Sequence, residues 1–362
     1  MQKYDGRYID SGARLKETTM IREGLTFDDV LLVPGYSDVK SRSTDVDISV
    51  KWNDLEFDHP VIPANMKTVT GGEMAIEVIQ SGGLAILHRF MEVQEQVDIA
   101  EDIMDMGGMN RFAVSLGVKD KDKDILARFV DVGVQMVCID IAHGDSKHCV
   151  DMTEWMRKTY PKLTIIAGNV ATGPGADRLW RAGADVVKVG VGPGSLCTTR
   201  IETGNGVPQL TALMDVAQAQ KNLLALYKTK QDSRQFPIIS DGGIKEAGDI
   251  VKALCFADMV MMGNFFAGCE ETPGKVHTIH GVPHKEYVGS STHKANHIEG
   301  VSAWVPCKGK FRDVLTKLLE GLRSGCSYQG AHNLEELRDN PEFIRITNAG
   351  LRESHPHDVI VR

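Results

Sequence analysis

The chain lacks the features of secreted, membrane-spanning and nucleic-acid-binding proteins. Its seven cysteines form no Cys-x-x-Cys pair, and their odd number indicates reduced thiols rather than a disulfide framework. No apolar run reaches the length that a bilayer requires, and the first residues are polar, unlike a secretory signal. The net charge is −8, without a stripe of lysine or arginine. We therefore expect a cytoplasmic protein that binds neither membranes nor nucleic acids.

The composition is that of an ordinary globular protein. Of the 362 residues, 42% are hydrophobic and 25% are charged, which is enough to build one large core. The sequence contains no internal repeat, no low-complexity segment and no sign of a second domain. We therefore predict a single domain over residues 1–362.

Eight short apolar runs alternate with longer amphipathic segments, which predicts strands connected by helices. The predicted strands are Pro60–Ala64, Gly83–Leu87, Phe112–Leu116, Met136–Asp140, Leu163–Gly168, Asp185–Val189, Pro237–Ser240 and Met259–Met262. The clearest helical segments are Val93–Met106, Lys147–Tyr160 and Gln209–Leu224. Continuous apolar strands separated by helices favour a parallel (β/α)8 TIM barrel, with a doubly wound open sheet as the alternative.

One cysteine stands in a glycine-rich loop directly after the predicted strand of DVVKVGV. The loop is GPGSLCTTR, and it contains Cys197 with Ser195 and Thr199 close by. Backbone amides of such a loop can hold an anion beside an exposed thiol. The pattern predicts covalent catalysis on a phosphate-bearing substrate, and a merely buried cysteine is the alternative.

Two further glycine loops follow the seventh and eighth predicted strands, where barrels commonly bind phosphate. They are SDGG, with Asp241, Gly242 and Gly243, and MMGN, with Gly263 and Asn264. Ser195 can add a hydroxyl donor, and Asp241 would then face ribose hydroxyls. Tight turns alone are the alternative explanation for these glycines.

The segment Glu270–Lys310 has little periodicity, and a long irregular segment of this kind is usually a functional lid or disordered. Its histidines, His277, His280 and His284, are better explained by a solvated hairpin than by a metal site. A helix over Phe311–Arg323 is predicted to follow.

Taken together, six motifs resemble the IMP dehydrogenase/GMP reductase family over nearly the whole chain. They are GLTFDDVLLVP, PANMKTVT, IDIAHGDS, AGNVAT, GPGSLCTTR and the DGG of Asp241–Gly243. The resemblance implies a (β/α)8 barrel, usually a homotetramer, that binds a purine mononucleotide and a nicotinamide cofactor. It also implies an active-site flap at residues 287–306 and a C-terminal tail at 340–362. Dehydrogenases of the family generally carry a CBS-domain insertion after the second strand, and Met91–Asn110 leaves no room for one.

The resemblance also assigns roles to individual residues. Cys197 matches the nucleophile that attacks purine C2, and Thr199 matches its catalytic neighbour. The implied nucleotide contacts are Ser195, Asp241, Gly242, Gly243, Gly263, Asn264, Tyr287, Gly289, Glu299 and Gly300. The implied cofactor contacts are Asp140, Asn169 and Gly190.

The two branches of the family share a covalent thioimidate and differ in its fate. The dehydrogenases hydrolyse it with an Arg–Tyr pair of the flap, whereas the flap here contains neither Arg nor a second Tyr, and Asn65 also resembles reductases. The resemblance therefore favours reductive deamination of GMP to IMP and ammonia with NADPH. His293 follows the position of a reductase glutamate and is either an acid–base catalyst or an exposed loop residue. Lys67 either contacts substrate or is a surface lysine.

Other interpretations remain. A dehydrogenase without CBS domains would oxidise IMP to XMP with NAD and potassium, using His293, Lys294 or His297 to activate water. A nucleotide-binding regulator without turnover and, more distantly, a flavin-binding barrel are further alternatives. NADH in place of NADPH stays open, because no residue can be assigned to the adenosine 2′-position.

The C-terminal motif ITNAGLRESHPHDV resembles that of the dehydrogenases and implies a potassium site between subunits. Its implied ligands are the carbonyls of Gly192, Gly194 and Cys197 together with Glu353, Ser354 and His355.

Overall fold

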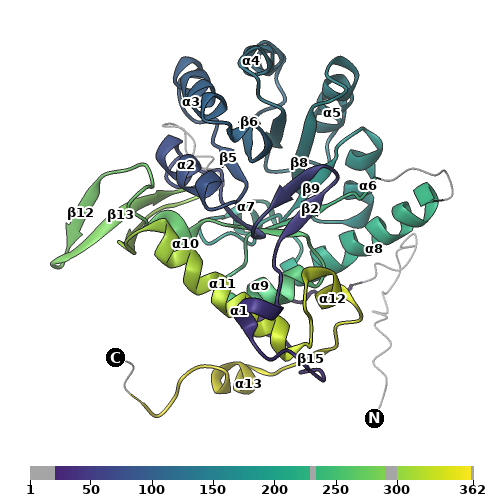
Figure 1. Cartoon of the computed structure of the whole chain (residues 1–362), viewed down its shortest axis with the longest axis vertical. Helices are drawn as coiled ribbons and strands as arrows, with labels where there is room; N and C mark the ends of the chain where they lie inside the picture. Colours follow the sequence, from purple (N-terminus) through teal and green to yellow (C-terminus); the bar gives the residue numbers. More distant parts are fainter. Residues whose placement is uncertain (1–20, 229–233, 290–299, 360–362) are drawn as a thin grey trace, which may run out of the picture.

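A computed structural model describes residues 21–228, 234–289 and 300–359 (Figure 1). All eight predicted strands are present and form one parallel sheet. The strands are β4 (Val61–Pro63), β5 (Ala85–Leu87), β6 (Phe112–Leu116), β7 (Met136–Asp140), β8 (Thr164–Val170), β9 (Val186–Val189), β10 (Ile238–Asp241) and β11 (Met259–Met262).

The sheet curls round until its last strand meets its first. The strand order is β4-β11-β10-β9-β8-β7-β6-β5, and β11 pairs with β4 in parallel, Val260 opposite Val61 and Met262 opposite Pro63. The chain therefore folds as a (β/α)8 barrel, and the alternative of an open doubly wound sheet is wrong. An open sheet would leave the first and last strands far apart, whereas here they share a ladder of hydrogen bonds.

Helices surround the sheet, and the residues of β5, β6 and β11 are all buried. Burial on both faces explains why these strands read as continuous apolar runs. The predicted helices are confirmed, with ends shifted by up to five residues. The helices around the barrel are α2 (Gly72–Gln80), α3 (Val93–Asp105), α4 (Asp120–Asp131), α5 (Lys147–Thr159), α6 (Gly173–Arg181), α8 (Gln209–Lys228), α9 (Ala247–Leu254) and α11 (Phe311–Tyr328).

Smaller elements fill the connections and the ends of the described chain. Strand β1 pairs antiparallel with β15, so that a segment before the barrel is joined to one after it. The remaining elements are η1 (Phe27–Asp29), β1 (Val30–Leu32), α1 (Arg42–Asp45), β2 (Val50–Trp52), β3 (Leu55–Phe57), η2 (Gly108–Asn110), α7 (Thr199–Thr203), α10 (Asn264–Ala267), α12 (Leu334–Arg338), β15 (Phe343–Arg345) and α13 (Asn348–Glu353). Only α3 and η2 lie between β5 and β6.

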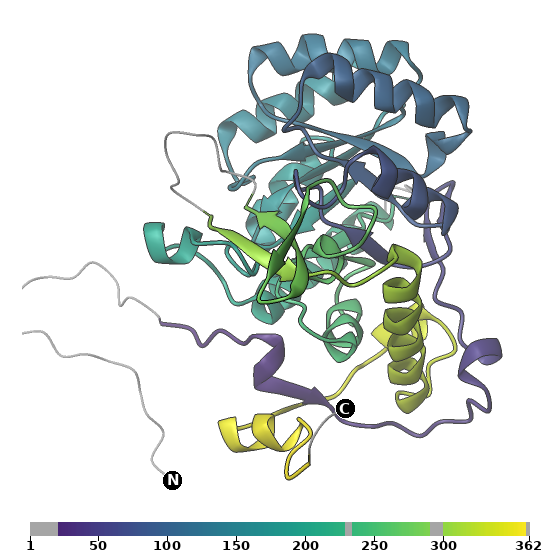
Figure 2. The ribbon, with the colours of Figure 1, turned by 90° about the vertical axis from the view of Figure 1, so that its left-hand side faces the viewer.

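The segment after the eighth barrel strand is more regular than its sequence indicates. Strands β12 (Val276–Ile279), β13 (Val282–Val288) and β14 (Ser302–Pro306) form an antiparallel sheet that projects from the barrel (Figures 1 and 2). For the described residues of Glu270–Lys310, the expectation of an irregular segment is therefore wrong. The predicted hairpin is confirmed, because His280 and Gly281 both have positive φ angles, of 50° and 80°, in the turn between β12 and β13. Within the described residues, no helix combines the length and apolar character needed to cross a bilayer.

Candidate active site

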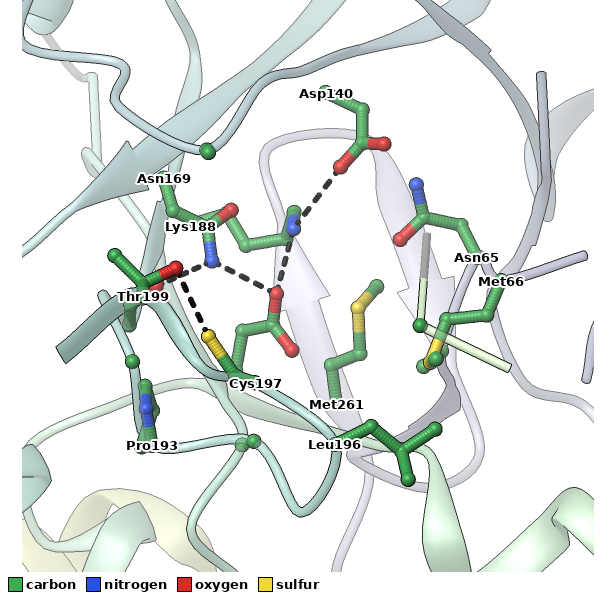
Figure 3. A pocket seen from close by; sticks show the side chains of 18 of the residues that line it. Asn65, Met66, Asp140, Asn169, Lys188, Pro193, Leu196, Cys197, Thr199 and Met261 are labelled. Carbon is green, nitrogen blue, oxygen red and sulfur yellow. Dashed lines mark hydrogen bonds and ion pairs between the residues drawn. The ribbon is translucent and has the colours of Figure 1, made fainter. Parts of the chain in front are cut away.

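A cavity of about 300 Å³ opens at the carboxyl ends of the barrel strands, where parallel barrels place their chemistry (Figure 3). Twelve residues singled out from the sequence line it. They are Asp140, Asn169, Gly190, Gly192, Gly194, Ser195, Cys197, Thr199, Asp241, Gly242, Tyr287 and Gly289. Residues from the ends of four strands, β7 to β10, and from the projecting sheet thus meet in one place.

The cysteine loop presents its thiol to this cavity. Cys197 is half-buried, and its backbone N–H donates to the carbonyl of Gly194 at 3.1 Å, which closes a tight turn. The Cys197 Sγ lies 3.1 Å from the Oγ1 of Thr199 (Figure 3). A hydroxyl at this distance can accept from the thiol and can donate to the thiolate, so the pair suits a nucleophile that loses and regains a proton.

Arg200 holds the two ends of this loop together. Its guanidinium donates to the carbonyls of Val191 and Val207, at 3.3 and 2.6 Å. Gly192 has a φ of 84°, and a Cβ there would lie 2.5 Å from the Arg200 Cγ, so the position requires glycine. Burial lowers the pKa of Arg200, and the neighbouring Cys197 opposes that shift.

The Asp241–Gly243 loop packs directly against the cysteine loop. Gly242 has a φ of 89°, and a Cβ there would lie 3.2 Å from the backbone nitrogen of Gly194. Its own N–H donates to the carbonyl of Met261 at 3.2 Å and is therefore not available to a phosphate. Within the described residues the N–H of Gly243 donates no hydrogen bond, which leaves it as the anion donor of this loop.

A lysine that the sequence analysis missed lies beneath these loops. Lys188 belongs to β9, and its Nζ donates to Asp241 Oδ2 at 2.6 Å and lies 3.5 Å from Asp140 Oδ1 (Figure 3). Asn169 Nδ2 donates to the same Asp241 oxygen at 2.9 Å and to the carbonyl of Gly190 at 2.7 Å. A charged residue inside the apolar run DVVKVGV was the signal that could have identified it.

The projecting sheet closes one side of the cavity. Tyr287 at the end of β13 is buried, and burial, followed by the charge of Asp241, raises its pKa above the ordinary value. The Gly289 N–H donates to the carbonyl of Val301, and the Val301 N–H donates to that of Leu196, each at 3.1 Å. The base of the flap is thus hydrogen-bonded to the cysteine loop.

Two polar side chains on the other side also point to a ligand site. Asn65 is buried and donates through Nδ2 to Ser115 Oγ at 2.8 Å. The Arg89 Nε is buried without a hydrogen-bond acceptor in the described residues, and it lies 3.8 Å from Asp140 Oδ2. Asn169 Oδ1 is likewise buried and lacks a donor there. Buried polar atoms are normally paired, so both atoms fit a bound polar molecule.

Other predicted site residues do not line the cavity. Gly263 and Gly300 lie at its edge, because a Cβ on Gly263 would collide with the Tyr287 hydroxyl, and Gly300 Cα would lie 3.2 Å from a Cβ on Gly289. Asn264 is exposed, and its carbonyl accepts from Lys308 Nζ at 2.7 Å, so its placement in the nucleotide site is not supported. His293 and Glu299 lie outside the described residues.

The two halves of the expected potassium site are apart within one chain. Helix α13, which leads to Ser354 and His355, lies far from α7 and the cysteine loop (Figure 1). His355 Nε2 lies 3.4 Å from Glu246 Oε1, and Ser354 Oγ donates to the Gly350 carbonyl at 2.9 Å. These residues could meet the loop only on another copy of the chain, and potassium binding stays a prediction.

A second cavity, of about 940 Å³, adjoins the first through Arg89, Phe90 and Ile141, which line both. Basic side chains line it together with acidic ones. The basic ones are Lys67, Arg89, Lys119 and Lys121, and the acidic ones are Glu92, Glu95 and Asp122. A long ligand could therefore extend from the cysteine site along the barrel rim.

Comparisons with known proteins agree with this geometry. The chain is 32% identical to the inosine-5′-monophosphate dehydrogenase of Aquifex aeolicus over 483 positions, covering 94% of this chain and 96% of the relative. It is 33% identical to the enzyme of the same name from Halalkalibacterium halodurans, covering 95% and 97%. The 483-position alignment exceeds the 362 residues of the chain, so the relative contains segments without a counterpart here.

A solved structure gives the same fold. It is a GMP reductase from Trypanosoma brucei with one cysteine replaced by alanine, in complex with guanosine 5′-monophosphate. The TM-score is 0.85 at 27% identity, and the match covers 94% of this chain and 99% of that one. The model of the IMP dehydrogenase / GMP reductase domain matches residues 24–357. With its barrel, its cysteine loop and these matches, the chain belongs to the IMP dehydrogenase/GMP reductase family.

Proposed function

We propose that this chain is a GMP reductase that converts GMP to IMP and ammonia with NADPH. The observation that carries the proposal is the flap, residues 287–306, which contains no Arg and only one Tyr. Without a guanidinium base to activate water, the covalent intermediate is better suited to reduction than to hydrolysis. The fold match to a GMP reductase bound to GMP supports the same reaction.

The nucleotide is proposed to lie across the first cavity. The phosphate would be bound at the ends of the last strands by Ser195, by the N–H of Gly243 and by the backbone at Gly263. Asp241 has one carboxylate oxygen occupied by Lys188 and Asn169 and would accept the ribose hydroxyls with the other. The purine would then extend toward the thiol.

Cys197 is proposed to supply the nucleophile. Its thiolate adds to C2 of the purine, the bond from C2 to the exocyclic nitrogen breaks, and ammonia leaves with a proton, forming a thioimidate. Thr199 donates to the thiolate before attack and again when cleavage of the C–S bond releases the thiolate. Hydride addition at C2 followed by cleavage of the C–S bond yields IMP and regenerates Cys197. In sum, GMP, NADPH and one proton give IMP, NADP⁺ and ammonia.

Members of this family are oxidoreductases that use nicotinamide cofactors, and the dihydronicotinamide supplies the hydride when bound. The residues here fit such a group. Within the described residues, Asn169 Oδ1 has no hydrogen-bond donor and could accept from a carboxamide N–H. The Arg89 Nε–H has no hydrogen-bond acceptor there, only the longer ion pair to Asp140, and could donate to a phosphate. Asp140 and Gly190 would complete the nicotinamide end, and the second cavity would hold the rest of the dinucleotide. We propose NADPH over NADH because Lys67, Lys119 and Lys121 line that cavity.

The protonation of ammonia is assigned to the flap. His293, outside the described residues, is proposed as its proton donor. We further propose one barrel domain without a CBS insertion, with residues 287–306 as the flap and 340–362 as the tail. A homotetramer would bring the tail of one copy to the cysteine loop of another and could complete a potassium site there.

The second candidate is an IMP dehydrogenase without CBS domains. It is favoured by relatives of 32–33% identity that bear that name. This candidate requires another base to activate water, in place of the missing Arg–Tyr pair.

Absorbance at 340 nm distinguishes the two candidates. Purified protein is mixed with GMP and NADPH or NADH, and separately with IMP, NAD⁺ and potassium. A fall in the first mixture with release of ammonia is expected. A rise in the second mixture alone would overturn the proposal in favour of the dehydrogenase. The Cys197→Ala variant serves as the control, since it should bind GMP in calorimetry yet turn over neither substrate.

A further inference from the structure

At the carboxyl ends of β7, β9 and β10, an ammonium group lies between two carboxylates that belong to different parts of the site. The Lys188 side chain is 3% exposed, and its Nζ lies 2.6 Å from Asp241 Oδ2 and 3.5 Å from Asp140 Oδ1. Because both oxygens neighbour one nitrogen atom, they are at most about 6 Å apart. Like charges at this separation disfavour each other's ionisation.

Within the described residues, each carboxylate has one further polar partner. Asn169 Nδ2 donates to Asp241 Oδ2 at 2.9 Å, and Arg89 Nε lies 3.8 Å from Asp140 Oδ2. Asp241 Oδ1 has no hydrogen bond within the described residues, while the residue itself lines the cavity. Lys188 and Asn169 therefore fix one oxygen of Asp241 and leave the other for a ligand.

Two other titratable groups near the cluster, Cys138 and Tyr287, carry no charge near neutral pH. Burial raises the pKa of the Cys138 thiol, on β7, to about 12. Burial and the charge of Asp241 raise the pKa of Tyr287 above its ordinary value. Burial alone would lower the pKa of Lys188, but Asp241 and Asp140 outweigh it and raise that pKa. Lys188 and Arg89 thus balance the two carboxylates.

We propose that Lys188 is a positioning residue, which keeps Asp241 and Asp140 ionised together and turns the free oxygen of Asp241 toward the ribose of the nucleotide. This role rests on the proposed function, because it assumes a nucleotide in the first cavity. Lys188 itself touches no substrate in this scheme. It couples the nucleotide end of the site, through Asp241, to the cofactor end, through Asp140.

Removing the ammonium should make nucleotide binding depend on pH. In Lys188→Met the two carboxylates face each other without a cation between them, and one of them retains a proton. When only about a tenth of the molecules have both carboxylates ionised at pH 7, nucleotide affinity falls about tenfold there. Most of that loss should disappear by pH 8.5.

The test is calorimetric titration of GMP and of IMP, without cofactor, between pH 6.5 and 8.5. The proteins are the wild type, Lys188→Met, Asp140→Asn and the double variant Lys188→Met/Asp140→Asn. The ratio of the Lys188→Met dissociation constant to that of the wild type is expected to fall from about tenfold at pH 7 toward one as the pH rises. The double variant, which lacks the competing carboxylate, should bind within a few-fold of wild type at every pH.

A ratio that is the same at every pH would overturn the role, since a purely structural lysine would weaken binding uniformly. Failure of the double variant to recover affinity while its circular dichroism and melting match wild type would also overturn it. If Lys188→Met does not fold, Lys188→Met/Asp140→Asn still tests the role, because it removes one negative charge together with the positive one. Its nucleotide affinity should then stay within a few-fold of wild type. A wild type that binds IMP but not GMP would instead overturn the reductase assignment, since both nucleotides present the same ribose.

Discussion

The hydroxyl of Thr199 gives the sharpest test of the cysteine loop. Its Oγ1 lies 3.1 Å from the Cys197 Sγ, at the start of the short helix α7. In the proposed reaction this hydroxyl donates to the thiolate before the attack on C2. Thr199→Val removes the donor while preserving the branched shape of the side chain, and Thr199→Ser retains the hydroxyl as the matched control.

The magnitude follows from the kind of bond that is lost. A hydrogen bond to a charged group is worth about 1.5–3 kcal/mol. A factor of ten in rate corresponds to about 1.4 kcal/mol, so covalent attack should slow by about 10- to 150-fold in Thr199→Val. Thr199→Ser should stay within a few-fold of wild type, since only a methyl group is lost.

The assay follows the covalent adduct directly and needs no cofactor. Protein is incubated with 6-chloropurine ribonucleoside 5′-monophosphate, whose ring is open to attack at C2, and intact-protein mass spectra are recorded over time. The thiolate adds at C2, the C2 hydrogen moves to C6 and chloride leaves from C6, so one purine nucleotide should be added without the halide. Peptide mapping should assign it to Cys197. The rate constant at saturating probe is compared among the three proteins.

Equal rates in wild type and Thr199→Val would refute the role given to this hydroxyl. Equal slowing of both Thr199 variants would refute it as well, because a lost methyl group would then explain the effect. Labelling at any other cysteine would remove the basis for the covalent mechanism itself.

Three further predictions concern stability and ions. Gly192→Ala should lower the free energy of unfolding, measured by urea titration, by about 1–3 kcal/mol, because φ is 84° and the new Cβ would meet Arg200. Gly204 also has a positive φ, of 69°, but a Cβ there would meet open space, so Gly204→Ala should lower the free energy of unfolding less. Burial lowers the pKa of His59 to about 4, so the unfolded chain takes up a proton near pH 6.5 that the fold excludes. The free energy of unfolding, measured by urea titration, should therefore fall by about 3 kcal/mol as the pH drops from 6.5 to 4. In a His59→Gln protein the same drop in pH should lower the free energy of unfolding less. Replacing potassium by tetramethylammonium should slow adduct formation at Cys197, and equal rates in both salts would contradict the potassium site.

The sequence was sufficient for the features that depend on neighbouring residues. All eight barrel strands were located correctly, because strands buried on both faces leave continuous apolar runs. The cysteine loop was found because glycines and a thiol after such a strand predict an exposed nucleophile. Twelve of the proposed site residues then meet in one cavity, since parallel strands carry their carboxyl ends to one rim.

Tertiary structure alone decided whatever depends on pairing between distant segments. Closure of the sheet needs β11 beside β4, and the antiparallel sheet of β12, β13 and β14 needs partners separated by loops. No local pattern encodes such register. The ionic cluster around Lys188 joins three different strands. The sequence therefore shows an unusual lysine within the apolar run of β9, but it does not show which carboxylates pair with it. For the same reason, the distance between α13 and the cysteine loop became clear only when the chain was folded.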